Sequence, residues 1–219
     1  MNNGVNSSDY FIYDGQTQIP HGTTHLKTTH DFNDTITLPS SITHLRFGSC
    51  YNQPTNNLPN SITHLTFGKN YNCITDDLPN SITHLTFGYH YNQPISTLPP
   101  LITHLTFGDL YNQPTNELPS SITHLTFGCF YNQPTNNLPP QCTYLALGLL
   151  FDSAIIFPSS ITNVYFRGRY DRYIKSLCKN NNLMYTNIQT SMIKNHIEKN
   201  KNNVVLKSLT LLSVCIHDS

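Results

Sequence analysis

A motif of twenty residues recurs along most of this chain. Its form at residues 41–48 is SITHLRFG, and eight units of this kind are visible. The close copies begin at Ser61, Ser81, Leu101 and Ser121, the worn copies at Gln141 and Ser160, and a degenerate copy at His21. Self-similarity at a fixed period of this length is typical of a solenoid, in which each unit packs only against its neighbours.

The apolar residues of each unit recur at a constant phase. In one unit they are Leu58, Ile62, Leu65, Phe67 and Tyr71, and residues 62–67 fit the L-x-x-L-x-L pattern of a leucine-rich repeat. The alternation within that hexapeptide predicts a short strand, confined by a proline before it and a glycine after it. Like residues of successive units are then expected to stack in interior columns, about 4.8 Å apart.

One asparagine also recurs at the same phase in six of the units. We interpret this column as an internal ladder, in which the side-chain amides bond the backbone of the turns, because unpaired buried backbone groups are costly. Its members are Asn33, Asn52, Asn72, Asn92, Asn112 and Asn132.

These patterns predict a mainly β solenoid, a right-handed stack of leucine-rich-repeat-like coils with one short parallel sheet. Residues 1–18 are expected to form an N-terminal cap or a disordered segment, and residues 19–168 the solenoid. Residues 169–219 are expected to form a basic, partly helical C-terminal cap, with a helix at 190–200 and a strand or short helix at 204–216. From residue 165 onward there are nine basic and three acidic residues, whereas the preceding residues hold three basic and nine acidic ones.

The repeat resembles the FNIP repeat family of social amoebae and large amoeba-infecting DNA viruses. The resemblance rests on LPNSITHLTFG at residues 78–88 and YNQP at 91–94, and it covers residues 19–168. The family usually has Phe before Asn-Gln and units near twenty-two residues. Here the units have Tyr and twenty residues, and only Phe32 keeps the Phe. Many relatives carry an F-box, which implies a ubiquitin-ligase adaptor, but the roughly 18 residues before the first unit are too few for that module.

A histidine occupies the centre of each predicted strand, on the outward face. The column consists of His44, His64, His84, His104 and His124, with His25 before it. We interpret it as a structural stack, with a shared metal ion or a ligand-facing surface as alternatives. Because stacked imidazolium ions repel each other, we expect neutral rings at pH 7 and a stability that falls toward pH 5.

The two residues that follow the repeat glycine differ from unit to unit. These pairs are Ser49–Cys50, Lys69–Asn70, Tyr89–His90, Asp109–Leu110 and Cys129–Phe130. A solenoid presents a long face whose side chains vary while the core repeats. We therefore predict a non-enzymatic protein-interaction module of unknown partner. The candidate contact residues are His44, Arg46, His64, His84, Tyr89, His90, His104, Leu110, His124 and Phe130.

Several other functions are not expected. The histidines recur at equivalent positions and no glycine-rich phosphate loop occurs, so no catalytic residue, cofactor or metal site is predicted. A net charge of zero argues against non-specific electrostatic binding to nucleic acid or to a membrane surface. No apolar stretch is long enough to span a bilayer. The six cysteines lack metal or disulfide spacing, which favours a reducing, intracellular location in a host or cell cytoplasm.

Two alternatives to the interaction module stay open. One is a substrate-binding adaptor for a ubiquitin ligase that lacks its own F-box. The other is nucleic-acid binding through the basic C-terminal cap, where residues 167–175 interleave cations with aromatic residues. If the chain is viral, a host protein is the natural partner.

Overall fold

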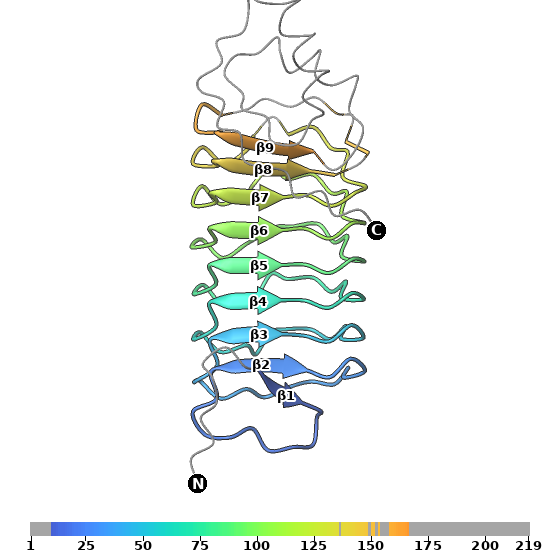
Figure 1. Ribbon diagram of the computed structural model, residues 1–219, viewed down its shortest axis with the longest axis vertical. Helices are drawn as coiled ribbons and strands as arrows, with labels where there is room; N and C mark the ends of the chain where they lie inside the picture. The colour runs from blue at the N-terminus through green and yellow to red at the C-terminus, as the bar shows by residue number, and fades with distance from the viewer. Residues whose placement is uncertain (1–9, 136, 149, 152, 154–157, 167–219) are drawn as a thin grey trace, which may run out of the picture.

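The computed structural model describes residues 10–135, 137–148, 150–151, 153 and 158–166. Within these residues the chain winds into stacked coils, each contributing one short strand to a single parallel sheet of nine strands in sequence order (Figure 1). The strands are β1 Phe11–Tyr13, β2 His25–Thr28, β3 His44–Arg46, β4 His64–Thr66, β5 His84–Thr86, β6 His104–Thr106, β7 His124–Thr126, β8 Tyr144–Leu147 and β9 Asn163–Phe166. The predicted β solenoid with one short parallel sheet is therefore confirmed, whereas the predicted C-terminal cap lies outside the described residues.

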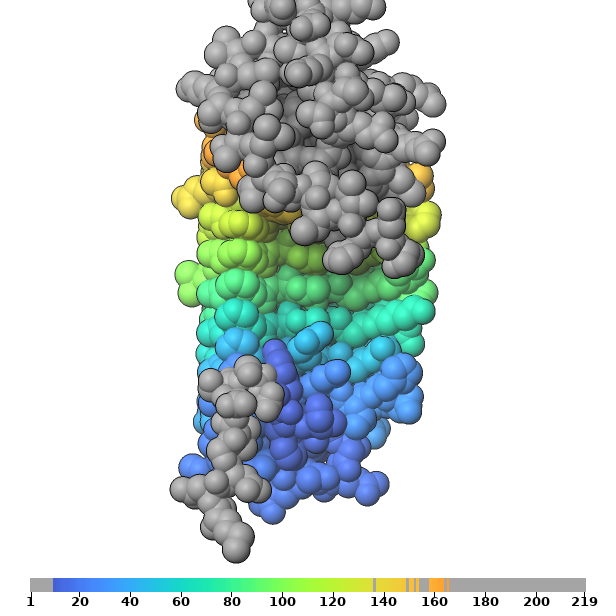
Figure 2. Space-filling model, viewed as in Figure 1, coloured from blue at the N-terminus to red at the C-terminus, as the bar shows by residue number. Residues whose placement is uncertain are grey.

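Like residues lie over like residues in the sheet. Leu65 pairs with Leu45 on one side and with Leu85 on the other, and His64 pairs with His44 and His84 in the same way. At the N-terminal end, β1 pairs in parallel with β2, so residues 11–13 of the predicted N-terminal segment add a strand to the sheet. Figure 2 shows the described coils as even layers along the long axis.

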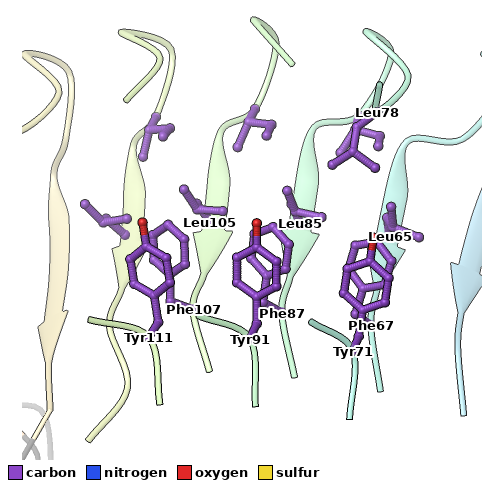
Figure 3. Close-up of a cluster of buried hydrophobic side chains, with 14 of the residues drawn as sticks. Leu65, Phe67, Tyr71, Leu78, Leu85, Phe87, Tyr91, Leu105, Phe107 and Tyr111 are labelled. Atoms are coloured by element: carbon purple, nitrogen blue, oxygen red, sulfur yellow. The ribbon is translucent and has the colours of Figure 1, made fainter. Parts of the chain in front are cut away.

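Each coil fills its interior with the phased apolar residues of the repeat. Ile62, Leu65, Phe67 and Tyr71 are all at most 3% exposed, and their counterparts in the neighbouring coils are buried in the same columns. Figure 3 shows the leucine column and, beside it, a phenylalanine column facing a tyrosine column. Within a coil the two aromatic rings stack, with centroids 3.7 Å apart for Phe67 and Tyr71. In a single coil these large side chains would be exposed to water. The stack of coils is therefore the unit that folds.

The tyrosine hydroxyls that enter this interior need hydrogen-bond partners. A threonine of the preceding coil supplies them: Thr75 Oγ1 lies 3.0 Å from the Tyr91 hydroxyl, and Thr115 Oγ1 lies 2.9 Å from that of Tyr131. Tyr111 is the exception, because Ile95 stands where the other units have threonine, and its hydroxyl is buried without a partner among the described residues.

The spacing between successive coils changes across the thickness of the solenoid. Equivalent histidine rings on the outer face of the sheet lie 4.1–4.3 Å apart, the interior phenylalanine rings 5.4–5.7 Å, and the tyrosine rings beyond them 6.0–6.1 Å. Paired strands lie about 4.8 Å apart, between the first two values. The stack therefore curves, with the histidine face of the sheet on its inner side.

Candidate partner-binding surface

The predicted histidine column exists as a continuous stack on the outward face of the sheet, which is the inner side of the curved stack of coils. Neighbouring rings lie within 11–15° of parallel from His25 to His124. Aromatic rings close both ends: Tyr10 meets His25 edge-on at 5.5 Å, and Tyr144 stacks on His124 at 5.5 Å. The side chains are half-buried, because each ring covers its neighbours while its rim reaches the surface.

A threonine just before each strand fixes the orientation of each ring. Thr63 Oγ1 lies 2.9 Å from His64 Nδ1, and the same contact recurs for His25, His44, His84, His104 and His124. In every histidine of the column, Nε2 is then the ring nitrogen that this threonine does not contact. Because the rings are parallel, these atoms all point the same way and do not converge as the ligands of a tetrahedral zinc ion do. The column is consequently suited to hydrogen bonding with an extended partner and not to sharing one ion.

The packing of the column also favours the neutral imidazole. Burial and, as a smaller cause, the positive charges that His84 and His44 would carry together lower the pKa of His64 to about 4. Burial is likewise the main cause that lowers the pKa of His44, His84 and His104, with other histidines of the column as the second cause. These rings are therefore uncharged at pH 7, in line with the expectation from the sequence.

The variable pairs after the repeat glycine form a ridge where the strands end. We call this surface the ridge; it comprises residues 49–50, 69–70, 89–90, 109–110 and 129–130. Backbone hydrogen bonds run along it, as from Leu110 N to Tyr89 O at 3.0 Å and from Phe130 N to Asp109 O at 2.9 Å. Tyr89 and Phe130 are 40% and 44% exposed, His90 is exposed, and Leu110 is half-buried.

Leu150 was missed in the sequence reasoning and continues this surface. It follows Gly148 by two residues, as Phe130 follows Gly128, and its backbone N donates to Cys129 O at 2.9 Å. Its side chain is 50% exposed. Equivalent positions in successive coils are thus occupied by Leu110, Phe130 and Leu150, which form one apolar column. The spacing from Gly148 in this diverged unit is the sequence signal that could have identified Leu150.

Arg46 lies apart from the ridge. It is exposed on β3, and its guanidinium carbon lies 5.7 Å from the centre of the Tyr10 ring, a cation–π contact. The structure therefore places Arg46 with the N-terminal end of the histidine column and not with the apolar residues of the ridge.

The asparagine ladder forms, but not in the interior. Asn52 Oδ1 accepts from Asn72 N at 2.8 Å, Asn72 Oδ1 from Asn92 N at 2.8 Å, and the pattern continues through Asn112 and Asn132. These side chains are half-buried or exposed, so the prediction of an internal ladder is wrong about its place. The turn lies at the rim of the coil, where the side-chain carbonyl oxygen of each asparagine accepts from the backbone of the next coil.

Among the described residues, no helix has the length and apolar character needed to cross a membrane. The basic C-terminal segment, with its alternative role in nucleic-acid binding, lies outside the described residues. None of the four described cysteines, Cys50, Cys73, Cys129 and Cys142, forms a disulfide.

Comparison with known proteins agrees with this geometry. The family model of the FNIP Repeat matches residues 51–90, 73–110, 91–130 and 111–150. The chain is also similar to the giant-virus protein CroV588, whose crystal structure is described as a novel circular LRR protein, with 39% sequence identity and a TM-score of 0.63. That match covers 76% of this chain, which spans only 27% of the length of the viral one. No similar chain was found among curated proteins. Residues 51–150 of this chain are thus FNIP repeats, and they form part of a leucine-rich-repeat-like solenoid.

Proposed function

We propose that this chain is a non-enzymatic protein-interaction module that binds its partner along the ridge and the inner, histidine-bearing face of the sheet. Solenoids of leucine-rich-repeat type suggest such a role, because they offer a long surface with few constraints on its side chains. The curvature supports the choice of face, since a partner seated on the inner side contacts several coils at once.

The observation that carries this proposal is the contrast between positions within the repeat. In the five closest units the segment Ile-Thr-His-Leu, which holds the buried Ile, is the same each time. The ridge, in contrast, carries Ser–Cys, Lys–Asn, Tyr–His, Asp–Leu and Cys–Phe in successive units. Tyr89 and Phe130 present large aromatic surfaces to solvent at these positions, and aromatic residues are the usual anchors of an interface. If the ridge sequence varied without functional constraint, large apolar side chains would not be expected to be exposed there.

The location that we propose is the reducing interior of a cell. Cys50, Cys73 and Cys129 are half-exposed and form no disulfide, which supports this location, because exposed thiols are poorly compatible with oxidising compartments.

The test is affinity purification of the full chain from cell extract, quantified by mass spectrometry. The ridge variant Tyr89→Ala, Leu110→Ala, Phe130→Ala is compared with a matched control, Ile74→Ala with Leu101→Ala. The control residues are 61% and 56% exposed and lie outside the ridge. We expect the specific partner to be lost from the ridge variant and retained by the control.

The same experiment decides among the alternatives. Identical partners for wild type and ridge variant would refute the ridge as the contact surface. Ligase scaffold proteins among the captured partners would support the adaptor role. Retention of RNA or DNA that is lost on truncation after Asn163 would instead support the C-terminal segment as the binding element.

A further inference from the structure

The fold brings together three potential metal ligands that the sequence keeps apart. His30 and Asp31 lie in the turn after β2, and Cys50 lies in the turn after β3, one coil further on. His30 Nδ1 is 2.6 Å from Asp31 Oδ1, and Cys50 Sγ is 3.8 Å from each of these two atoms. In the described part of the chain, this is the group of histidine, cysteine and acidic side chains whose ligand atoms gather within 4.8 Å of one another.

The backbone holds these residues in register. Cys50 N donates to His30 O at 2.9 Å, which is the same inter-coil bond that links the residues of the ridge. His30 and Asp31 therefore occupy the ridge positions of the first coil, directly beneath Ser49 and Cys50. The placement of the three side chains follows from the stacking of coils, so no flexible loop must close to assemble them.

The distances are close to those of a zinc site. Zn–N and Zn–O bonds of about 2.1 Å and a Zn–S bond of about 2.3 Å, at tetrahedral angles, separate sulfur from nitrogen or oxygen by about 3.6 Å and nitrogen from oxygen by about 3.4 Å. The two sulfur distances already lie near this value. The His30–Asp31 pair must open by about 0.8 Å to reach it, which is feasible because these side chains are 70% and 91% exposed.

We propose that His30 Nδ1, Asp31 and Cys50 Sγ bind a divalent zinc ion at the N-terminal end of the ridge, with the remaining coordination position open to solvent. A mixed set of nitrogen, oxygen and thiolate ligands suits Zn²⁺ better than Mg²⁺ or Ca²⁺, which prefer oxygen alone. Binding displaces the proton shared by His30 and Asp31 and the thiol proton of Cys50. The acidic excess of residues 1–164 adds a favourable field for a cation.

This site differs from the histidine column in the feature that matters for a metal. The column presents parallel rings whose nitrogens all point outward, whereas here the three side chains approach one point from two coils. The two surfaces therefore make separate predictions, and loss of one does not entail loss of the other.

The test is titration of the full-length, reduced chain with Co²⁺, which reports thiolate coordination through its charge-transfer absorption, followed by displacement with Zn²⁺. We expect one equivalent of Co²⁺ to produce the thiolate band in the wild type. Cys50→Ser is expected to abolish the band, and His30→Ala to weaken binding by at least the roughly 10–100-fold seen when outer-shell partners are removed.

Two further ridge residues supply matched controls. Cys129→Ser removes another half-exposed thiol of the ridge, and His90→Ala removes another exposed imidazole, so both should leave the band unchanged. Far-ultraviolet circular dichroism verifies that each variant is folded. Absence of the thiolate band in the wild type, or its persistence in Cys50→Ser, would overturn the proposal.

Discussion

Acidification is expected to destabilise the solenoid through its histidine column. The folded pKa of His64 lies near 4, below the value of 6.5 for a free imidazole. As the pH falls through 6.5, the unfolded chain therefore binds protons that the folded histidine column does not bind. The equilibrium consequently moves toward unfolding. Stability should be fully present above pH 7 and should be lost progressively between pH 6.5 and pH 4.

The magnitude can be worked out for one ring. At pH 5.0, a shift from 6.5 to about 4 lowers the free energy of unfolding by about 2 kcal/mol for His64 alone. Because the ring is partly exposed, solvent screening reduces this to about 1 kcal/mol. For a chain of this length that corresponds to a fall in melting temperature of about 2–4 °C. His44, His84 and His104 shift in the same direction, so the observed fall should be larger.

The assay is thermal unfolding at pH 7.5 and pH 5.0, followed by circular dichroism in the presence of EDTA. The variant His64→Asn, His84→Asn should reduce the difference between the two melting temperatures, and β9 already carries Asn163 at this position of the strand. The control His90→Asn, which changes a ridge histidine outside the column, should keep the full difference. An equal or higher melting temperature at pH 5.0 in the wild type would refute the argument.

Four further substitutions test the packing and the hydrogen bonds of the coils. Gly88→Ala places a methyl group onto the carbonyl oxygen of Gly68 and should destabilise by about 3 kcal/mol or more, so a folded variant with an unchanged melting temperature would contradict the close approach of coils. Tyr111→Phe removes a hydroxyl without a partner and should be neutral, whereas Tyr131→Phe should cost about 1–2 kcal/mol in denaturant titrations; equal costs would contradict this. Asn92→Ala removes one acceptor of the ladder and should cost about 1 kcal/mol by the same measurement, and no loss would mean that water replaces it.

Much of the fold follows from the period of the sequence. Once the units are twenty residues long and the apolar positions keep their phase, like residues must lie over like residues. The rows of Leu65, Phe67 and Tyr71 follow directly from this. The outward direction of His64 follows from the alternation within the strand. The place of Asn72 does not follow, because a turn at residues 69–70 separates it from the strand, so the alternation within the strand gives no side for it.

The metal-ligand cluster was missed for a related reason. The repeat glycine is required where the preceding coil brings a carbonyl too close for a Cβ, as the carbonyl of Thr29 does at Gly48. In the first coil Thr29 itself holds the glycine position, so the ridge pair that follows it, His30 and Asp31, carries no glycine to mark it. Strands β2 and β3 are also offset by nineteen residues instead of twenty, as His25 pairs with His44. A strict period therefore misaligns this unit.

The curvature of the stack connects the two properties of the histidine face. On the inner side the coils converge, so the imidazole rings come within 4.1 Å of each other, closer than the roughly 4.8 Å between strands. This contact makes protonation costly, and it also aligns the ring edges into one narrow row along the surface that a partner would contact. If a partner supplied carboxylates to that row, it would favour the charged imidazoles and raise their pKa, so binding should be tighter at pH 6 than at pH 8. A partner that bound through neutral hydrogen bonds would show the opposite dependence. The pH profile of binding would therefore reveal the charge of the partner's contact surface.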